Sequence, residues 1–471
     1  MNVKLSGLVR NFSYTIIANL VALFISMLVT FIVPKAISVE DYGFFQLYLF
    51  YASYVGFFHF GWMDGLFLRY GGVYYEDLDK SLFKGELILF FIFEAFLSAI
   101  LCACACIINT DINNKFVFGI TAASIVLINV RVFFMDILQC TGRIKEYSIL
   151  NVVGRILYIC LVILLIQFGY RRFYVYVIAD ICGRIVSTAY GAFKCKKIVC
   201  ADKCEYHLAL NESKENIKVG IKLLFATIAS SLIIGVVRLG INSAWDITTF
   251  AKVSLTLSIS NLLMVFVRAV ALVLFPTLRR IDAGKLDQVY DIMRSAIMIP
   301  LLGMLVFYYP IRIIVGTWLP QYAESLKYMA LLFPMCIYES KMSMLIETYM
   351  KVLRKEHELM VINVLTLVLS LFVTGISCYV IRSLDIAVSS IVLLLAFRCV
   401  CSELILMRSD TSRVRKDIVF ELSLTLVFIA SSWFVGGING TIIYLIAYIL
   451  YIIQKRNDFA RLIYTIKKHP S

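Results

Sequence analysis

Residues 13–34 read SYTIIANLVALFISMLVTFIVP, a run without a single charged side chain. A helix needs about 20 predominantly apolar residues to cross the hydrocarbon core of a bilayer, which is about 30 Å thick. Similar apolar runs, separated by short charged connections, follow along the rest of the 471-residue chain. The pattern predicts an all-α membrane protein in which residues 13–34 form the first transmembrane helix.

The composition is also that of a membrane protein. Hydrophobic residues make up 61% of the chain and charged residues 16%, whereas soluble domains contain about 45–50% apolar and about 25% charged residues. The net charge of +14 does not indicate nucleic-acid binding, because most lysines and arginines lie in short loops between apolar runs. The first run is too long for the apolar core of a cleavable signal peptide, so we interpret it as a retained helix.

The apolar runs set the expected topology. We expect fourteen transmembrane helices, at about residues 13–34, 43–67, 83–108, 116–140, 147–168, 173–193, 217–241, 248–276, 291–316, 325–350, 358–381, 384–407, 418–435 and 438–454. Lys and Arg concentrate in alternate loops, above all at about 194–216. Because cytoplasmic loops carry the excess of basic residues, this distribution predicts that both termini are cytoplasmic.

The two halves of the chain resemble each other in register. A shift of 208 residues places Leu66 on Leu274, and a shift of 212 places Asn151 on Asn363. Each repeat holds six spans, so the two repeats share one orientation, as parallel repeats of transporters do. We expect two pseudo-symmetric six-helix lobes around a central cavity, at residues 1–200 and 201–410, with two extra helices and a cytoplasmic tail in residues 411–471.

Polar side chains recur at helical spacing on the repeat-related spans one, two, seven and eight. They either line a water-filled cavity or bond back to their own helices and across tight helix contacts. Together the stripes favour the cavity, and its candidate residues are Asn19, Gln46, Asp64, Arg238, Asn242, Lys252, Asn261 and Arg268. Few acidic residues share helices seven and eight with the cations, and arginine grips phosphate through its planar fork. We therefore expect Arg238 and Arg268 to contact a phosphate of an anionic substrate.

Other charged side chains lie within predicted spans four to six, ten and twelve. They are Arg131, Asp136, Arg155, Asp180, Arg184, Glu339, Lys341, Glu347, Arg398 and Glu403. Since charges in a membrane are costly unless paired or hydrated, the mixed signs favour ion pairs within each lobe, and a proton or sodium relay is the competing interpretation.

No catalytic or metal-binding motif stands out. The chain has no phosphate loop of the G-x-x-x-x-G-K-[ST] form and no H-E-x-x-H zinc motif. The 13 cysteines are scattered mostly through apolar runs and imply no disulfide framework. We therefore expect a transporter rather than an enzyme, with no cofactor, driven by a proton, sodium or substrate gradient.

Short motifs at the ends of several spans carry a family resemblance. They are Asn11 near the start of span one, Ser-Val-Glu-Asp-Tyr-Gly at 38–43, Gly-Trp-Met-Asp-Gly-Leu-Phe-Leu-Arg at 61–69, Gln-Cys-Thr-Gly-Arg at 139–143 and Leu-Phe-Pro at 274–276. These motifs resemble those of bacterial polysaccharide flippases of the Wzx type, within the multidrug/oligosaccharidyl-lipid/polysaccharide (MOP) exporter superfamily.

The resemblance implies a function. It implies that twelve to fourteen helices in two lobes move an oligosaccharide on undecaprenyl pyrophosphate from the cytoplasmic to the outer leaflet by alternating access. The protein would then lie in the bacterial inner membrane and serve the synthesis of lipopolysaccharide O-antigen or capsule. Its partners would be the lipid-linked glycan, membrane lipids and a polysaccharide polymerase or glycosyltransferases.

Two other functions stay open at the level of sequence. A small-molecule exporter of the MATE type belongs to the same superfamily, but a cationic cavity argues against the export of cations. A membrane polysaccharide polymerase or ligase would need a large outer loop, and all the predicted outer loops are short.

Overall fold

The computed structural model describes residues 2–108, 111–278, 286–406 and 411–456, and all the regular secondary structure in these ranges is helical. The chain forms two compact units, Met1–Ile228 and Ala229–Ser471, and each is described by itself. Helix α9 (Tyr206–Ala244) begins in unit 1 and ends in unit 2.

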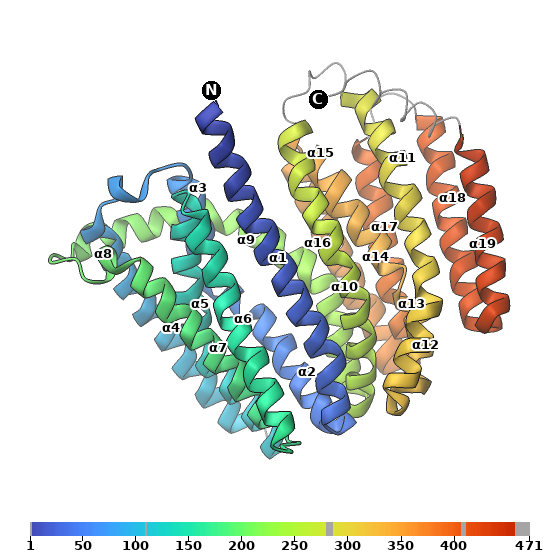
Figure 1. The fold of residues 1–471 in the computed structure, drawn as a ribbon, viewed down its shortest axis with the longest axis horizontal. Helices are drawn as coiled ribbons and strands as arrows, with labels where there is room; N and C mark the ends of the chain where they lie inside the picture. The colour runs from blue at the N-terminus through green and yellow to red at the C-terminus, as the bar shows by residue number, and fades with distance from the viewer. Residues whose placement is uncertain (1, 109–110, 279–285, 407–410, 457–471) are drawn as a thin grey trace. The chain divides into compact units, whose positions relative to one another are not determined.

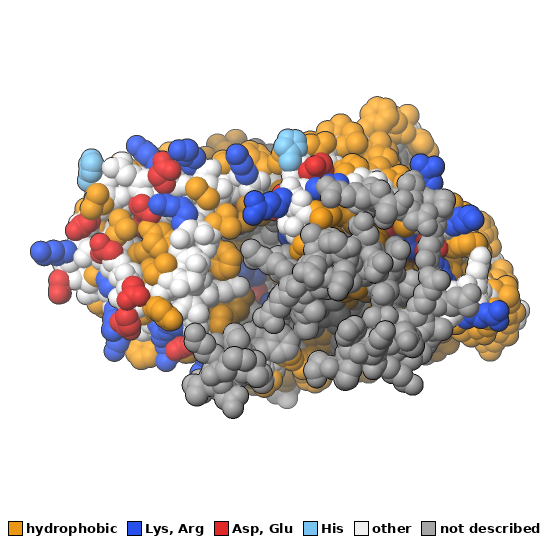
Figure 2. Space-filling view, turned by 90° about the horizontal axis from the view of Figure 1, so that it is seen from above, with side chains coloured by type: hydrophobic (Ala, Val, Ile, Leu, Met, Phe, Trp, Pro, Cys, Tyr) orange, Lys and Arg blue, Asp and Glu red, His pale blue; other side chains and the backbone are white. Residues whose placement is uncertain are grey.

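Unit 1 is built from long helices (Figure 1). They are α1 (Asn2–Ala36), α2 (Val39–Tyr54), α3 (Trp62–Tyr70), α4 (Lys80–Ile108), α5 (Ile112–Cys140), α6 (Ile144–Gln167), α7 (Phe173–Lys194), the short α8 (Lys196–Val199) and the first part of α9. Helix α6 packs along α1 and α7, while α5 packs on α2, α4 and α7. Figure 2, a view onto the end that carries α3 and α8, shows charged side chains gathered there, as at a membrane surface.

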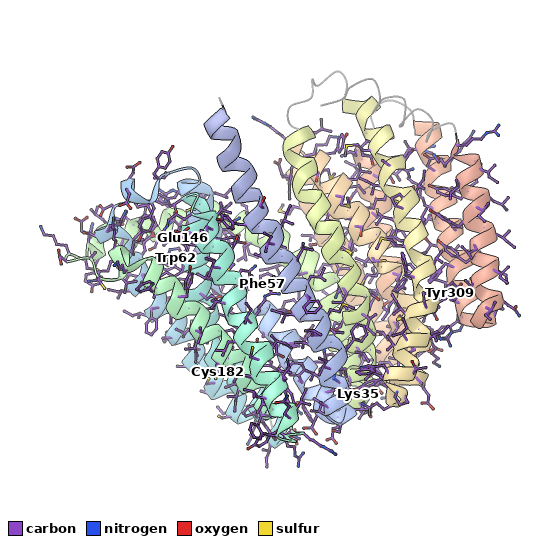
Figure 3. The ribbon with its side chains drawn as sticks, viewed as in Figure 1. Lys35, Phe57, Trp62, Glu146, Cys182 and Tyr309 are labelled. Atoms are coloured by element: carbon purple, nitrogen blue, oxygen red, sulfur yellow. The ribbon has the colours of Figure 1, made fainter. Side chains whose placement is uncertain are left out.

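The second predicted span is interrupted. Helix α2 ends at Tyr54, a 3-10 turn (η1, Val55–His59) follows, and Phe60 and Gly61 adopt left-handed conformations with φ of 49° and 82° before α3 begins. Gly61 also packs so closely on α9 that a Cβ would lie 2.6 Å from the amide nitrogen of Ile221. Glycine has no Cβ and therefore tolerates both the positive φ and the close contact with α9. Figure 3 labels Phe57 within this break and Trp62 just beyond it.

Eleven helices of the described residues are long and apolar enough to cross a membrane, compared with fourteen predicted. The predicted spans outside this count correspond to α2–α3, α7 and α10 (Ile247–Leu278), and the count does not cover the second half of α10. The first is divided by the break after Tyr54, and α7 carries Asp180 and Arg184 in its middle. The chain is thus a multi-pass membrane protein.

Unit 2 contains more short helices than unit 1. After α10 come α11 (Leu286–Met304), α12 (Tyr308–Trp318), α13 (Leu326–Leu332), α14 (Met335–Lys341), α15 (Glu347–Val352), α16 (Glu356–Gly375), α17 (Leu384–Leu406), α18 (Thr411–Ala430) and α19 (Gly437–Gln454). Three π-helical segments interrupt them, at η6 (Met342–Ile346), η7 (Ile376–Val380) and η8 (Ser431–Val435).

The two last helices pack within unit 2. Helix α18 contacts α11, α13 and α17, and α19 contacts α11 and α12. The hydroxyl of Tyr309 (Figure 3) donates to the carbonyl oxygen of Gly440 at 2.9 Å, and Tyr444 donates to that of Leu302 at 2.7 Å. The two helices predicted as an addition to the lobes are therefore bound to the rest of this unit.

Candidate functional site

Three arginines of unit 1 lie at similar distances from the same ends of their helices. Arg131 on α5, Arg155 on α6 and Arg184 on α7 are each nine to eleven residues from the helix end that adjoins loops 141–143 or 195–205. At a rise of 1.5 Å per residue this is about 15 Å, half the thickness of the hydrocarbon core. We refer to these three residues, with Asp180 and Tyr48, as the arginine cluster.

Two glycines bring two of these arginines together. Gly154 and Gly183 precede Arg155 and Arg184, and α6 and α7 cross at them so closely that a Cβ on Gly183 would lie 2.5 Å from the carbonyl oxygen of Gly154. Small residues at such crossings let membrane helices approach closely. The close crossing therefore places Arg155 and Arg184, which carry like charges, next to each other on adjacent helices.

Asp180 is the carboxylate of the arginine cluster. It accepts a hydrogen bond from the hydroxyl of Tyr48 on α2 at 2.7 Å and an ion-paired one from Nε of Arg184, one turn further along α7, also at 2.7 Å. Side chains four residues apart face each other on a helix. Asp180 therefore neutralises Arg184.

The other two arginines have no carboxylate bonded to them within the described residues. Arg131 donates to the hydroxyl of Ser187 at 2.8 Å and to the side-chain oxygen of Asn151 at 3.4 Å, both neutral acceptors. Arg155 is exposed and interacts electrostatically with Arg184 and Asp180. Three guanidinium groups and one carboxylate leave the arginine cluster with two positive charges in excess.

The predicted cavity residues of unit 1 lie apart from these arginines. Gln46 is buried and donates to the hydroxyl of Tyr42 at 2.7 Å. Asp64 lies 3.9 Å from Nε2 of His59, and Asp136 interacts electrostatically with Asp64. Asn19 is half-buried on α1. Asp136 thus lies near Asp64, and Tyr147 interacts electrostatically both with Asp136 and with Arg131 and Arg155.

In unit 2, one buried arginine is fully compensated. Arg398 on α17 lies 3.0 Å from Glu347 and 3.6 Å from Glu339, and its Nε donates to Asn363 at 2.7 Å. Its side chain is 1% exposed. The π-helical turn η6 separates Lys341 from Glu347 and changes which way the following helix faces. Two carboxylates around one arginine leave no positive excess here.

A second set of charges in unit 2 forms what we call the ion network. It links α11, α14, α17, α18 and the residue after α19, and its members are Arg294, Lys341, Glu403, Asp417, Glu421 and Lys455. Arg294 contacts Glu403 at 2.6 Å and Asp417 at 3.0 Å, while Lys341 contacts Glu421 at 2.8 Å. Three cations meet three carboxylates, so the network is balanced.

Sequence analysis singled out only Lys341 and Glu403 of the ion network. The missed members Asp417 and Glu421 stand four residues apart in the first half of α18, a spacing that puts both on one face. The four-residue spacing could have indicated an acidic face on α18. It does not reveal that Arg294 of α11 contacts that face.

The predicted cations of spans seven and eight lie in the part of unit 2 near the turn at 245–246. Arg238 donates to the hydroxyl of Ser254 at 3.1 Å and lies over the ring of Phe250. Lys252 lines a hollow of about 420 Å³ together with Glu324, Lys327 and Tyr328. Asn242 is half-buried and Asn261 exposed. The side chain of Arg268 lies outside the described residues.

Many hydroxyl groups of the predicted polar stripes bond to their own helices. Ser26, Thr30, Thr227 and Ser258 each donate to the carbonyl oxygen four residues earlier, at 2.8 to 3.0 Å. This is the alternative to a cavity that the sequence left open, and it applies to these four hydroxyls. Among the described residues, no group of three or more His, Cys, Asp or Glu is placed to hold a metal ion.

Comparison with known proteins gives the fold. No family model and no curated protein matches the sequence. The structure is similar to the inward-facing conformation of a multidrug resistance MATE family transporter of the MOP superfamily (TM-score 0.59, 12% identity, 86% of this chain and 96% of that chain). It is also similar to the outward-facing conformation of such a transporter (TM-score 0.56, 14% identity, 88% and 96%).

A third similar structure is described as a MOP superfamily transporter from Pyrococcus furiosus, in which the reverse polarity of the binding pocket suggests a different function (TM-score 0.50, 14% identity, 88% of this chain and 96% of that chain). At these identities the likeness concerns the fold alone. The chain has the fold of MATE family transporters of the MOP superfamily.

Proposed function

We propose that this protein is a flippase that moves a lipid-linked oligosaccharide pyrophosphate from the cytoplasmic to the outer leaflet by alternating access. The observation that carries the proposal is the arginine cluster, in which Arg131, Arg155 and Arg184 share the single carboxylate of Asp180 near the middle of the membrane. Uncompensated positive charge at this depth is costly unless water or an anion meets it. A pyrophosphate is an anion of suitable size and charge.

Arg155 is the member best suited to contact the phosphate. Its side chain is exposed. Among the described residues, no hydrogen-bond or ion-pair partner of Arg155 is found. Lipid tails cannot stabilise such a group, so Arg155 faces water or a ligand. Its planar guanidinium can form two parallel hydrogen bonds to phosphate oxygens, which a lysine cannot match in geometry.

Arg238 and Lys252 form a second cationic site for the phosphate in this proposal. Arg238 is six residues before the end of α9, and Lys252 is five residues after the start of α10. Both therefore lie about 8–9 Å from the turn at 245–246. In the proposed cycle, these cations hold the pyrophosphate in one of the alternating states while the lipid tail stays in the bilayer. The predicted contact of Arg268 with phosphate is part of the same proposal.

A MATE-type exporter of small molecules is the second candidate, and the fold likeness favours it. Export of organic cations requires acidic side chains in the substrate path, whereas the arginine cluster has two positive charges in excess. The polarity of this cluster favours the flippase. In the flippase proposal, a proton or sodium gradient drives the cycle, and the product passes to a polysaccharide polymerase or glycosyltransferase.

The proposal is tested by the sidedness of undecaprenyl-pyrophosphate-linked oligosaccharide in native cells from which the gene is deleted. Complementation with wild type, Arg155→Gln, Arg155→Lys and the loop control Arg172→Gln follows. We expect deletion to trap the glycan on the inner leaflet and Arg155→Gln to restore less than a tenth of the wild-type export. Arg155→Lys should restore an intermediate amount, and Arg172→Gln should restore all of it.

Two outcomes would contradict the flippase. If repeat units reach the outer leaflet in the deletion strain but stay unpolymerised, the protein serves polymerisation instead. If deletion leaves the glycan unaffected but sensitises the cells to organic cations, the MATE-type exporter is correct.

A further inference from the structure

One carboxyl group in unit 1 is buried without a counter-ion. Glu94 lies at the middle of α4, fourteen residues from either end, and its relative exposure is 0%. The helix thus carries a carboxyl group to the centre of the bilayer. An ionised carboxylate in such a place is stable only beside a cation or several hydrogen-bond donors.

The partner of Glu94 is a neutral amide. Nδ2 of Asn129 on α5 donates to Oε2 of Glu94 at 2.8 Å. The other carboxyl oxygen, Oε1, and the side-chain oxygen of Asn129 are both buried and have no hydrogen-bond donor among the described residues. These two oxygens belong to side chains that are already joined by one hydrogen bond. A single proton on Glu94 would therefore supply the donor that both oxygens lack.

Among the described residues, no charge near Glu94 replaces that proton. The elements packed against α4 are α5, η1 and α8, together with α3 and α9, whose Trp62 and Asn216 contact Phe90 and Glu86. On α3, Asp64 lies beside His59, and Arg69 and Tyr70 bond Glu212 of α9; α9 meets α4 at Glu86, about two turns before Glu94. The titratable or charged side chains of α5, η1 and α8 are His59, Lys115, Arg131, Asp136, Cys140, Lys196 and Lys197.

Each of these groups is occupied or placed elsewhere. Arg131 is directed to α6 and α7 by its bonds to Asn151 and Ser187, and His59 bonds the amide of Gly61. Lys115 lies at the first turn of α5, Asp136 and Cys140 in its last turns, and Lys196 and Lys197 lie beyond the end of α7. Within the described ranges, only burial and the amide of Asn129 act on the carboxyl of Glu94.

Asn129 also connects Glu94 to the break in the second span. Its Nδ2 donates to the carbonyl oxygen of Val55 at 3.3 Å, where α2 changes into η1. The amide thus donates to Glu94 and to the carbonyl oxygen of Val55, the first residue of the 3-10 turn η1. A carboxylate at Glu94 would attract the amide of Asn129 more strongly than a carboxylic acid does, and this attraction would weaken the hydrogen bond from Asn129 to Val55.

We propose that Glu94 is a proton-binding site whose protonation is coupled through Asn129 to the break between α2 and α3. With the proton bound, the amide holds Val55 and the break is stable. Loss of the proton weakens that hydrogen bond, so α2 and α3 change their conformation. That this change drives transport rests on the proposed function, whereas proton binding itself does not.

Proton binding is tested without transport by infrared difference spectra of the full chain in lipid nanodiscs, recorded as the pH is changed. Protonated and ionised carboxyl groups absorb at different frequencies, so one site can be followed. We expect Glu94→Gln to remove the band of one protonated carboxyl. The control Glu86→Gln, which changes another buried carboxyl of α4 that is bonded to Asn216, should leave that band in place.

Coupling to the break is tested by fluorescence of Trp62, the first residue of α3. In a chain whose other three tryptophans are changed to phenylalanine, we expect Trp62 emission to change with the same midpoint as the infrared band. Glu94→Gln should hold the emission at its low-pH value throughout, and Glu86→Gln should retain the change. A pH-dependent emission that persists in Glu94→Gln overturns the proposal, as does a sodium-dependent change at constant pH that matches it.

Transport distinguishes this inference from the proposed function. If Glu94→Gln removes the band and the emission change but wild type flips no lipid-linked oligosaccharide, the proposed function fails and the proton site stands. If wild type flips the lipid and Glu94→Gln still responds to an imposed proton gradient as wild type does, the flippase stands and the coupling is wrong.

Discussion

Asn151 and Asn363, which the predicted repeat places in register, each accept a hydrogen bond from an arginine of their own unit. The arginine that binds Asn363 is Arg398, which also contacts two carboxylates. The arginine that binds Asn151 is Arg131, and it contacts none in the described residues. The two units thus share a bond between an arginine and an asparagine but differ in the number of carboxylates around the arginine.

The same contrast in charge balance, between Arg155 of the arginine cluster and Arg398, predicts effects of different size for two arginine substitutions. Arg155→Gln should change the free energy of unfolding by less than about 0.5 kcal/mol, because Arg155 is exposed. Arg398→Gln should cost about 3 kcal/mol, because it leaves Glu339 and Glu347 without their cation. Thermal unfolding of the purified variants in mild detergent measures both. Equal losses in the two variants would show that Arg155 is structural.

The contact between α6 and α7 gives a steric prediction. A Cβ on Gly154 would lie 2.4 Å from the carbonyl oxygen of Gly183, so Gly154→Val should separate the helices that carry Arg155 and Arg184. We expect a loss of about 1–3 kcal/mol in stability together with a loss of transport. The matched control is Gly119→Ala, since a Cβ at Gly119 meets nothing within 4 Å. A Gly154→Val variant as stable as wild type would mean that this contact does not position the arginines.

Much of the fold follows from local sequence signals. Long apolar runs predicted the membrane helices, because the bilayer core requires about 20 apolar residues per span. The break at Val55–Gly61 was not predicted, because its sequence, Val-Gly-Phe-Phe-His-Phe-Gly, is as apolar as a continuous helix. Only the close packing of Gly61 on α9 shows why the chain turns there.

The sequence singled out the charged residues of the arginine cluster, but as ion pairs or an ion relay rather than as a phosphate site, and it did not single out Tyr48. The sequence identified Arg131, Arg155 and Arg184 as charges in the membrane, and mixed signs suggested ion pairs. Which arginine finds a carboxylate depends on helix contacts. Asp180 lies one turn from Arg184 and bonds it, whereas Arg155 is on another helix. Charge balance within a unit is a tertiary property, which composition does not contain.

The first turn of α10 gives a prediction about pH. Burial acts to raise the pKa of Asp246, but hydrogen bonds from the hydroxyls of Thr248 and Thr249 and from the amide of Thr249 outweigh it and leave the pKa below its usual value. A lowered pKa stabilises the fold above the pKa of the unfolded carboxyl, and this stabilisation is lost as the pH falls through the folded pKa. We expect the start of α10 to loosen below pH of about 4.

Hydrogen exchange at Thr249 and Phe250 measures this loosening. Asp246→Ala should loosen the turn at all pH values, with a loss of about 1 kcal/mol, because the side chain caps the helix. Asp246→Asn keeps a capping oxygen without the charge, so it should exchange slowly at every pH. A pH-dependent exchange in Asp246→Asn would assign the effect to another group.

The orientation of the chain is tested by a natural cysteine. Cys200 is exposed beyond α8, in the basic loop that we expect in the cytoplasm. With all other cysteines changed to alanine, a membrane-impermeant maleimide should label Cys200 only after the cells are permeabilised. Tyr170→Cys, in the loop between α6 and α7, should be labelled in intact cells. The reverse pattern would invert the topology.

The ion network of unit 2 is expected to hold the helices together rather than to bind substrate. Lys341 is 3% exposed and contacts Glu403 and Glu421, so Lys341→Met leaves three carboxylates with two cations and should cost about 3–5 kcal/mol of stability. The double variant Lys341→Met/Glu403→Gln restores the balance of charge and should recover part of that loss.

The same two variants separate stability from function. Because the ion network has no positive excess and is nearly closed to solvent, the double variant should flip the anionic lipid at a rate close to wild type once it is folded. The measurement is flipping per folded molecule, with the folded fraction taken from the detergent unfolding curve. A double variant that is as stable as wild type but inactive would place Lys341 on the path of the substrate or of the coupling ion. The ion network would then take part in transport rather than only stabilise the fold.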